Sequence, residues 1–169
     1  MTTSETRTVI LDHKQVSQKI TRIAHEIIEN NFVEKSLVIM GIKSEGFVLA
    51  ERLVKILTQI SDMDIVLHEV SIDKKKPLSS GLVSSIEENE LNNKAVILVD
   101  DVLNSGKTLV YATKFLLDHK IKRLQTVCLV DRKHRKFPIR ADFVGLTLST
   151  TLQEHITVEF GKYDCVYLD

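Results

Sequence analysis

Apolar residues recur at two different spacings along the chain, and the spacing separates the predicted helices from the predicted strands. Between Val16 and Ile28 they fall three or four residues apart, which predicts an amphipathic helix that Asp12 can cap. The same spacing predicts helices around residues 49–57 and 107–119. Short uninterrupted apolar runs predict strands at residues 37–42, 65–72, 97–99, 126–130, 143–148, 156–160 and 165–168.

The order of these elements predicts the fold class. Strands that alternate with helices are typical of an α/β protein whose mostly parallel sheet is covered on both faces. With 169 residues, of which 43% are hydrophobic, the chain can bury one substantial core, which predicts a single domain over residues 1–169. Ligands of such sheets bind at the carboxyl ends of the strands, so the loops after Ile42, Val99 and Val130 should form one site. Between Asp73 and Asn93 the pattern fails, and we expect a mobile hairpin or loop.

Charge and cysteine content exclude some functions. The 23 basic and 23 acidic residues balance, so contact with nucleic acid has to come from a local patch, such as the basic run between Asp131 and Arg140. No apolar run approaches the roughly 20 residues of a membrane span, and the polar start does not suit a secretory signal, so we expect a cytoplasmic location. Cys128 and Cys165 lie in apolar runs without metal-ligand spacing, which predicts buried free thiols.

The segment from Asp100 to Thr108 predicts a phosphate site beside a sugar site. An apolar strand leads to Asp100 and Asp101, and a turn containing Gly106 then opens a helix. The amide groups from Asn104 onward would point at one spot, where the helix dipole favours an anion, and the carboxylates could accept hydrogen bonds from a sugar diol. A nucleotide-triphosphate loop is excluded, because its first glycine would fall on Asp101. The remaining alternative is a capped helix after two solvated acids.

Residues 97–108 resemble the signature of type I phosphoribosyltransferases, which consists of four apolar residues, two acids and a short turn ending in Thr. Residues 21–28, 41–43, 99–103, 129–132, 134–135 and 138–142 resemble the PyrR family of pyrimidine-operon attenuation regulators. That family combines RNA attenuation with uracil phosphoribosyltransferase activity. The resemblance implies a type I phosphoribosyltransferase fold with a small hood, phosphoribosyl pyrophosphate (PRPP) as substrate, Mg²⁺ bound with PRPP, and a homodimer or larger homo-oligomer.

The resemblance also implies a role for each part of the site. Asp100 and Asp101 would be catalytic, because they would hold the ribose hydroxyls and favour the positive charge that develops during transfer. No dedicated metal cage is expected, since the oxygens of PRPP carry most of the Mg²⁺ coordination near these two acids. The implied PRPP-binding residues are Asp100, Asp101, Val102, Leu103, Asn104, Ser105, Gly106, Lys107 and Thr108. The pyrophosphate loop would comprise Ile42, Lys43, Ser44, Glu45 and Gly46, and the base would lie near Val130, Asp131, Arg132 and Ile156.

Two departures from the family pattern bear on catalysis. Where the family commonly has Lys-Thr-Arg-Gly, this chain has Lys43-Ser44-Glu45-Gly46, which places an anion beside a highly charged leaving group. If Glu45 faces the site, its repulsion would weaken PRPP binding, whereas an outward side chain would have almost no effect. The second departure is the shortened loop at residues 73–80, where the family has a longer segment that closes over the reacting centre.

A possible RNA surface lies on the first predicted helix. Thr21 and His25, with Arg22 to one side, fall roughly opposite the apolar stripe and should be exposed. In the PyrR resemblance these positions bind RNA together with His134, Arg135 and Arg140, and their donor groups suit phosphates and splayed bases. Leu146 stands where the family has Lys. The alternative is a solvated helix face beside an ordinary basic loop.

Three functions are consistent with these sequence features. The leading hypothesis is a PyrR-like enzyme that transfers the phosphoribosyl group of PRPP to uracil, giving UMP and pyrophosphate, and that also binds pyrimidine-operon mRNA. The alternative is an RNA-binding attenuation regulator that senses PRPP or nucleotides in the same pocket with little or no catalysis. Transfer to a purine comes third, because the similarity between Asp131 and Arg140 favours the pyrimidine branch.

Overall fold

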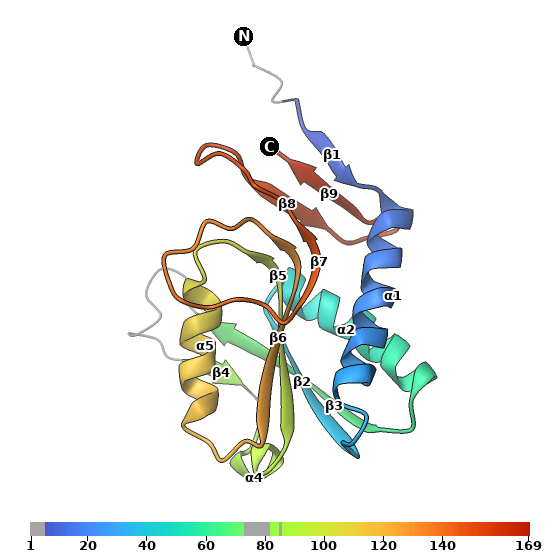
Figure 1. Cartoon of the computed structure of the whole chain (residues 1–169), viewed down its shortest axis with the longest axis vertical. Helices are drawn as coiled ribbons and strands as arrows, with labels where there is room; N and C mark the ends of the chain where they lie inside the picture. Colours follow the sequence, from blue (N-terminus) through green and yellow to red (C-terminus); the bar gives the residue numbers. More distant parts are fainter. Residues whose placement is uncertain (1–5, 73–81, 85) are drawn as a thin grey trace.

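The computed structural model describes residues 6–72, 82–84 and 86–169, which form a large sheet between helices and a small sheet at one end (Figure 1). Along the chain the elements are β1 (Thr8–Leu11), α1 (His13–Asn30), β2 (Ser36–Ile42), α2 (Glu45–Ile60), β3 (Asp64–Ile72), β4 (Leu82–Ser84), α4 (Glu88–Leu91), β5 (Ala95–Leu103), α5 (Lys107–Leu117), β6 (Arg123–Asp131), β7 (Phe143–Thr147), β8 (Ile156–Glu159) and β9 (Cys165–Leu168).

The large sheet has the strand order β4-β3-β2-β5-β6-β7. The five strands from β3 to β7 in this order are parallel, and β4 pairs with β3 in the antiparallel direction. The central strands β2 and β5 are buried almost throughout, which explains why their sequences are continuous apolar runs. The predicted α/β class with a mostly parallel sheet is confirmed.

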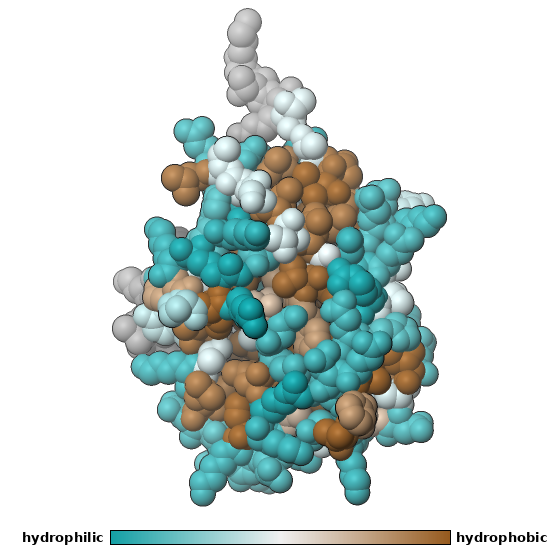
Figure 2. Space-filling view, viewed as in Figure 1, coloured by the Kyte–Doolittle hydropathy of each residue, from teal (hydrophilic) through white to brown (hydrophobic). Residues whose placement is uncertain are grey.

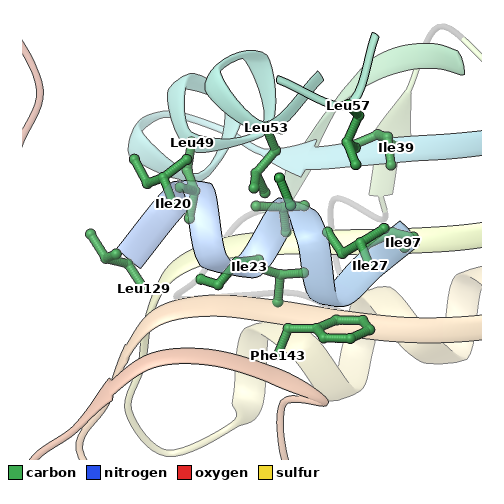
Figure 3. Close-up of a cluster of buried hydrophobic side chains, with 14 of the residues drawn as sticks. Ile20, Ile23, Ile27, Ile39, Leu49, Leu53, Leu57, Ile97, Leu129 and Phe143 are labelled. Carbon is green, nitrogen blue, oxygen red and sulfur yellow. The ribbon is translucent and has the colours of Figure 1, made fainter. Parts of the chain in front are cut away.

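Helices cover both faces of this sheet. On one face Ile20, Ile23 and Ile27 of α1 and the leucines of α2 pack against strand residues such as Ile97 (Figure 3). On the other face α5 packs Leu116 and its neighbours in a cluster with Cys128 and others. Cys128 is buried as predicted, whereas Cys165 is only half-buried, and both are free thiols.

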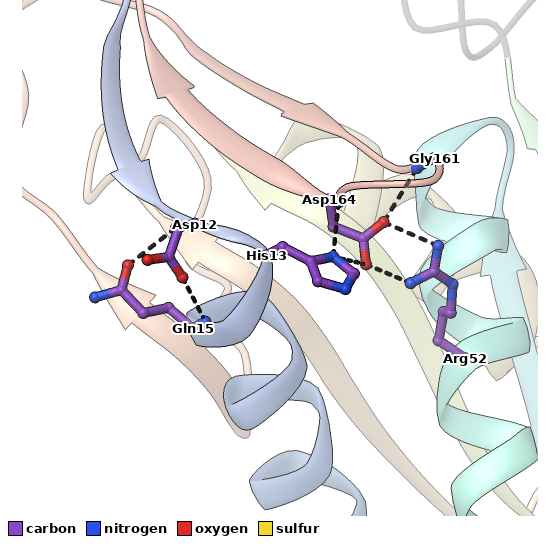
Figure 4. A network of polar contacts seen from close by, with 6 residues as sticks. All are labelled: Asp12, His13, Gln15, Arg52, Gly161 and Asp164. Carbon is purple, nitrogen blue, oxygen red and sulfur yellow. Dashed lines mark hydrogen bonds and ion pairs between the residues drawn. The ribbon is translucent and has the colours of Figure 1, made fainter.

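Local sequence explains the start of α1. The side chain of Asp12 accepts a hydrogen bond from the main-chain N–H of Gln15, and the Gln15 side chain accepts one from the N–H of Asp12, both at 2.9 Å (Figure 4). This reciprocal capping box satisfies two donors that a helix leaves unpaired at its first turn. The predicted cap at Asp12 is confirmed.

The small sheet, here called the hood, has the order β1-β9-β8 and is antiparallel. It is held to the helical face by Asp164, in the turn between β8 and β9, which is 2% exposed in its side chain. Arg52 of α2 grips this carboxylate with two hydrogen bonds, and the main-chain N–H of Gly161 donates a third at 3.0 Å (Figure 4). His13 at the start of α1 accepts a hydrogen bond from the Asp164 N–H at 2.9 Å.

The segment between residues 73 and 93 contains more structure than predicted. β4 pairs with β3 as one arm of a hairpin, and the four-residue helix α4 follows it. α4 escaped prediction because one helical turn is too short to show a period. The shortened loop at residues 73–80, with the run Lys74 to Lys76, lies outside the described residues.

The view in Figure 2 shows a mostly hydrophilic surface, with apolar side chains gathered over the hood at the top. Val9 of β1 and Tyr163 of the β8–β9 turn are exposed by 55% and 72%. Among the described residues, no helix is both long enough and apolar enough to cross a membrane.

Candidate active site

A cavity of about 200 Å³ opens at the carboxyl end of β5. It is lined by Asp100 and by residues 102–109, so the structure brings together the predicted PRPP-binding residues apart from Asp101. Because β2, β5 and β6 are neighbours in the parallel sheet, the loops that follow them meet at the same edge, as predicted.

The loop from residue 104 to residue 108, here called the phosphate loop, is shaped by Gly106. Gly106 is the N-cap of α5 and has a φ of 85°, a left-handed conformation that favours glycine. A Cβ at this position would lie 2.5 Å from Ile139, so the following segment also packs closely against it. The carbonyl of Ser105 accepts hydrogen bonds from the N–H groups of Lys136 and Phe137 at 2.9 and 3.1 Å. The segment of residues 136–139 therefore holds the phosphate loop in place.

The two aspartates lie inside β5 rather than beyond it. Asp100 pairs with Cys128 and Val102 pairs with Val130 across the ladder to β6. Side chains of a strand alternate between faces, so Asp100 follows Leu98 toward the α5 face, where it lines the cavity and is 4% exposed. Asp101 points instead toward the face of α2 and the hood, and it is half-buried. The main-chain N–H of Asp101 donates to the Asp100 carboxylate at 2.9 Å.

The predicted pyrophosphate loop joins β2 to α2. Lys43 and Ser44 are exposed, and the peptide bond between them is cis. Glu45 and Gly46 already belong to the first turn of α2. A Cβ on Gly46 would stand 3.0 Å from Asp100 Cα, so glycine lets the start of α2 approach β5 closely. This close approach places the loop beside the aspartates.

Glu45 does not turn outward into solvent. Its side chain is half-buried. Burial raises its pKa, the negative charges of Asp101 and Glu159 raise it further, and a hydrogen bond from the main chain of Phe160 opposes the change. Glu45 therefore lies between Asp101 and the hood, within electrostatic range of Asp101.

The residues predicted to bind the base lie at the end of β6 and in the hood. Val130 is fully buried, and Ile156 is half-buried at the start of β8. The carboxylate of Asp131 accepts a hydrogen bond from Arg135 at 2.5 Å and another from the N–H of Lys133 at 2.9 Å. Arg132 is 6% exposed and donates to five acceptors. Asp131 and Arg132 thus organise this side of the site.

The residues predicted to bind RNA fall into two groups. Thr21, Arg22 and His25 are exposed on α1, as predicted, and Arg140 is exposed before β7. Arg22 is nevertheless engaged, because it pairs with Glu26 at 2.6 Å and donates to the carbonyl groups of Val144 and Gly145 in β7 at 3.1 and 2.8 Å.

His134 and Arg135 face the interior of their loop. His134 lies 2.5 Å from the carbonyl oxygen of Thr150, and Arg135 pairs with Asp131. An arginine can only donate, so the contact of Arg132 with His134 Nδ1 at 3.2 Å makes that nitrogen the acceptor and leaves Nε2 as the donor to Thr150. These two side chains therefore support the site rather than stand free beside Thr21 and His25.

One part of the site carried no signal in the sequence. Residues 150–154 supply three of the acceptors that hold Arg132, namely the hydroxyl of Thr150 and the carbonyl groups of Thr151 and Glu154. Two of these three acceptors are main-chain atoms, whose positions depend on the path of the loop and not on residue type. The segment has no periodic pattern, so sequence reasoning assigned it no role.

Among the described residues, no group of three or more His, Cys, Asp or Glu side chains is arranged to hold a metal ion. Asp100 and Asp101 nevertheless offer carboxylate oxygens at the site, which is the ligand type that Mg²⁺ prefers. One or two carboxylates are enough where a substrate brings further oxygens, so the residues present fit an ion that arrives with its substrate.

The fold and the site define the class of protein. Residues 6–163 match the family described as phosphoribosyl transferase domain, so the chain belongs to the phosphoribosyltransferase family. Within this family it is a PyrR-type chain. It is 40% identical to the bifunctional protein PyrR of Alkaliphilus metalliredigens, with 95% of this chain and 93% of the relative covered, and 36% identical to that of Macrococcus caseolyticus, with 92% and 93% covered.

Solved structures show the same fold. A hypoxanthine-guanine phosphoribosyltransferase from Bacillus anthracis superposes with a TM-score of 0.72 at 25% identity, covering 83% of this chain and 81% of that chain. A hypoxanthine phosphoribosyltransferase from Trypanosoma cruzi superposes with a TM-score of 0.72 at 17% identity, covering 88% and 83%. The predicted type I phosphoribosyltransferase fold is confirmed.

Proposed function

We propose that this protein transfers the phosphoribosyl group of PRPP to uracil, giving UMP and pyrophosphate, and that it also binds pyrimidine-operon mRNA. The observation that carries the enzymatic part is the cavity at the end of β5, where the phosphate loop and Asp100 share one wall. Amide donors at the start of α5 suit a 5-phosphate, and the adjacent carboxylates suit ribose hydroxyls. Similarity to PyrR proteins over most of the chain supports the pyrimidine base.

The residues of the chain act mainly by positioning and electrostatics. The phosphate loop anchors one end of PRPP, and the loop of Lys43 and Ser44 receives the pyrophosphate at the other. Asp101 stabilises positive charge on the ribose as the bond to pyrophosphate breaks and the base nitrogen forms its bond to the same carbon. Asp100 or Asp101, together with substrate oxygens, would hold Mg²⁺, which would neutralise charge at the pyrophosphate.

The RNA part of the proposal rests on Thr21, His25 and Arg140, which are exposed. The net charge of zero means that long-range attraction contributes little, so recognition depends on local contacts. A cytoplasmic location and a homo-oligomer remain part of the same proposal, and sedimentation would establish the number of copies.

Glu45 supports the alternative of a PRPP sensor without catalysis, because its carboxylate would repel the pyrophosphate end of PRPP. Similarity to proteins named as bifunctional favours the enzyme over this alternative. Transfer to a purine is also less well supported, because the hypoxanthine enzymes are more distant in sequence than the PyrR proteins.

Pyrophosphate release tests the proposal. The protein is incubated with Mg²⁺ and PRPP and with uracil, hypoxanthine or no base, and release is expected with uracil alone. The double variant Asp100→Asn with Asp101→Asn should lose PRPP binding in calorimetry while keeping its unfolding transition, because the amides cannot replace the charge. PRPP binding without turnover on any base would favour the sensor, and unchanged affinity in the double variant would contradict the site.

RNA binding is tested separately, by filter binding of a pyrimidine-operon leader transcript. We expect His25→Ala to weaken retention of this transcript, because His25 is exposed on α1. Lys14→Ala, on an exposed position at the start of the same helix, serves as the control. Equal weak retention of any RNA by all three proteins would end this part of the proposal.

A further inference from the structure

Arg132 is the most heavily engaged side chain at the site. Its Nε donates to the Thr150 hydroxyl at 3.0 Å, and its Nη1 donates to the Asn104 amide oxygen at 2.9 Å. Its Nη2 donates to the Glu154 carbonyl at 2.5 Å and also contacts the Thr151 carbonyl and the His134 ring at 3.3 and 3.2 Å. These acceptors come from three separate segments, of which one is the phosphate loop.

All five acceptors are neutral groups, although Arg132 is 6% exposed and carries a full charge. Burying a charge is costly unless hydrogen bonds or an opposite charge compensate it. Here the hydrogen bonds provide most of the compensation, and the carboxylate of Glu154 also lies within electrostatic range of Arg132. A guanidinium is planar and rigid, so its acceptors cannot move independently without breaking hydrogen bonds.

The contact with Asn104 sets the orientation of an amide at the cavity. Asn104 lines the cavity, and its Oδ1 accepts from Arg132, so its Nδ2 must point the other way. The main chain of Arg132 strengthens the same link, because its N–H donates to the carbonyl of Leu103 at 3.0 Å. Arg132 therefore fixes the start of the phosphate loop through both its main chain and its side chain.

On the side away from the phosphate loop, Arg132 stabilises a compact turn. The carboxylate of Glu154 accepts from the N–H of Thr151 at 2.6 Å, and Arg132 binds the carbonyl groups at both ends of the same turn. This turn, residues 151–154, precedes β8 and Ile156, where the base is expected. Leu152 at its tip is 87% exposed, so packing against the core does not hold it.

We infer that Arg132 is a positioning residue that couples the phosphate loop to residues 150–154, so that binding of a 5-phosphate also orders the wall of the base site. This inference rests on the proposed function, since it assigns the 5-phosphate to the phosphate loop. It changes the predicted role of Arg132 from direct contact with the base to support of the groups that surround the base.

The coupling is tested in the whole protein with ribose 5-phosphate and, separately, pyrophosphate as probes. The variant is Arg132→Gln, and the matched control is Arg123→Gln at the other end of β6, where Arg123 donates to the Asn30 carbonyl at 2.6 Å. We expect Arg132→Gln to lose about tenfold in affinity for ribose 5-phosphate, as for one charge-assisted hydrogen bond. Affinity for pyrophosphate should stay within about twofold, since the five acceptors described for Arg132 all lie outside the pyrophosphate loop.

Hydrogen exchange distinguishes coupling from a purely structural role of Arg132, because only coupling makes exchange in residues 150–154 respond to ribose 5-phosphate. In the wild type, ribose 5-phosphate should slow exchange in residues 150–154, and in Arg132→Gln it should have no effect there. Equal loss of affinity for both probes, or an unchanged response of residues 150–154 in the variant, would overturn the inference. If the wild type binds no ribose 5-phosphate, the proposed function fails first.

Thr150→Val keeps the test decisive if Arg132→Gln does not fold. This variant removes one acceptor of Arg132 with little change in shape and leaves the phosphate loop intact. We expect faster exchange in residues 151–154 and weaker binding of ribose 5-phosphate by about threefold, a fraction of the effect of losing the whole guanidinium. Unchanged ribose 5-phosphate affinity in Thr150→Val would show that residues 150–154 and the phosphate loop are independent.

Discussion

At the scale of single residues, we expect the charge of Glu45 to weaken the binding of pyrophosphate. Its carboxylate is half-buried and lies within electrostatic range of Asp101 and Glu159. Like charges that share a partly buried site repel one another and any anion that enters. Under the proposed function, Glu45 should therefore oppose the binding of PRPP and pyrophosphate, and the phosphate loop should be unaffected.

Replacing Glu45 by Gln should raise the affinity for pyrophosphate by about tenfold, which corresponds to roughly 1.4 kcal/mol of repulsion. Calorimetry with pyrophosphate and with ribose 5-phosphate separates the two ends of the site, and only the first should change. Glu51→Gln, an exposed position on the same helix, is the matched control. Equal pyrophosphate affinity in wild type and Glu45→Gln would mean that the charge is fully screened.

The same residue predicts a pH dependence. The pKa of Glu45 is raised, mainly by burial, so the wild-type side chain is neutral at low pH and becomes an anion as the pH rises through that raised pKa. Repulsion of pyrophosphate appears with that ionisation. The advantage of Glu45→Gln in pyrophosphate affinity should therefore grow as the pH rises and then level off, and a constant advantage would contradict the assignment.

At the scale of elements, the three long helices and most strands could be predicted because their causes are local. α1 combines a 3.6-residue period with a capping residue, and both are visible in the sequence. β5 was predicted too short, because Asp100 and Asp101 interrupt the apolar run although pairing with β6 carries the strand to Leu103. β1 was missed, since its partner β9 lies at the other end of the chain.

Parts of the candidate site could likewise be predicted where their causes are local. The phosphate loop follows from a strand, a glycine and a helix that are adjacent in sequence. The network around Arg132 depends on acceptors from three segments, so residue types alone could not reveal it. Side chains alternate along β5, so those of Asp100 and Asp101 point to opposite faces of the sheet although the two residues are adjacent in sequence.

The cap of α1 gives a prediction at this scale. Asp12→Ala removes the acceptor for the Gln15 N–H and should destabilise the protein by about 1 kcal/mol. For a chain of this size the melting temperature should fall by about 2–4 °C. Asp12→Asn keeps an acceptor at the cap and should melt within about 1 °C of the wild type, because Asn and Asp cap equally well. Equal losses in both variants would show that charge, not capping, is responsible.

At the scale of the whole molecule, the hood is joined to the main body through Asp164. Burial alone would raise the pKa of Asp164, but hydrogen bonds from Arg52 and Gly161 and the charges of Arg52 and His13 lower it overall. A carboxyl whose pKa is lowered on folding stabilises the folded state above its unfolded pKa of about 3.9. That stabilisation is lost as the pH falls through the lower, folded value.

Arg52→Ala should therefore destabilise the protein by about 3 kcal/mol near neutral pH, because it leaves a buried carboxylate without its main partner. The figure lies at the lower end for buried pairs, since the Arg52 side chain is 34% exposed. Urea unfolding measures the effect, and Lys55→Ala on the same helix is the control. The stability difference between wild type and Asp164→Asn should shrink in acid below about pH 4, and a constant difference would refute the role of the ion pair.

Arg22 has a consequence beyond RNA. Its guanidinium covers main-chain oxygens of Val144 and Gly145 in β7, the last strand at one side of the large sheet. Uncovered edge strands recruit foreign strands and promote aggregation. A neighbouring chain could not extend the sheet at these oxygens without displacing Arg22. Arg22 therefore protects this part of the margin against edge-to-edge association.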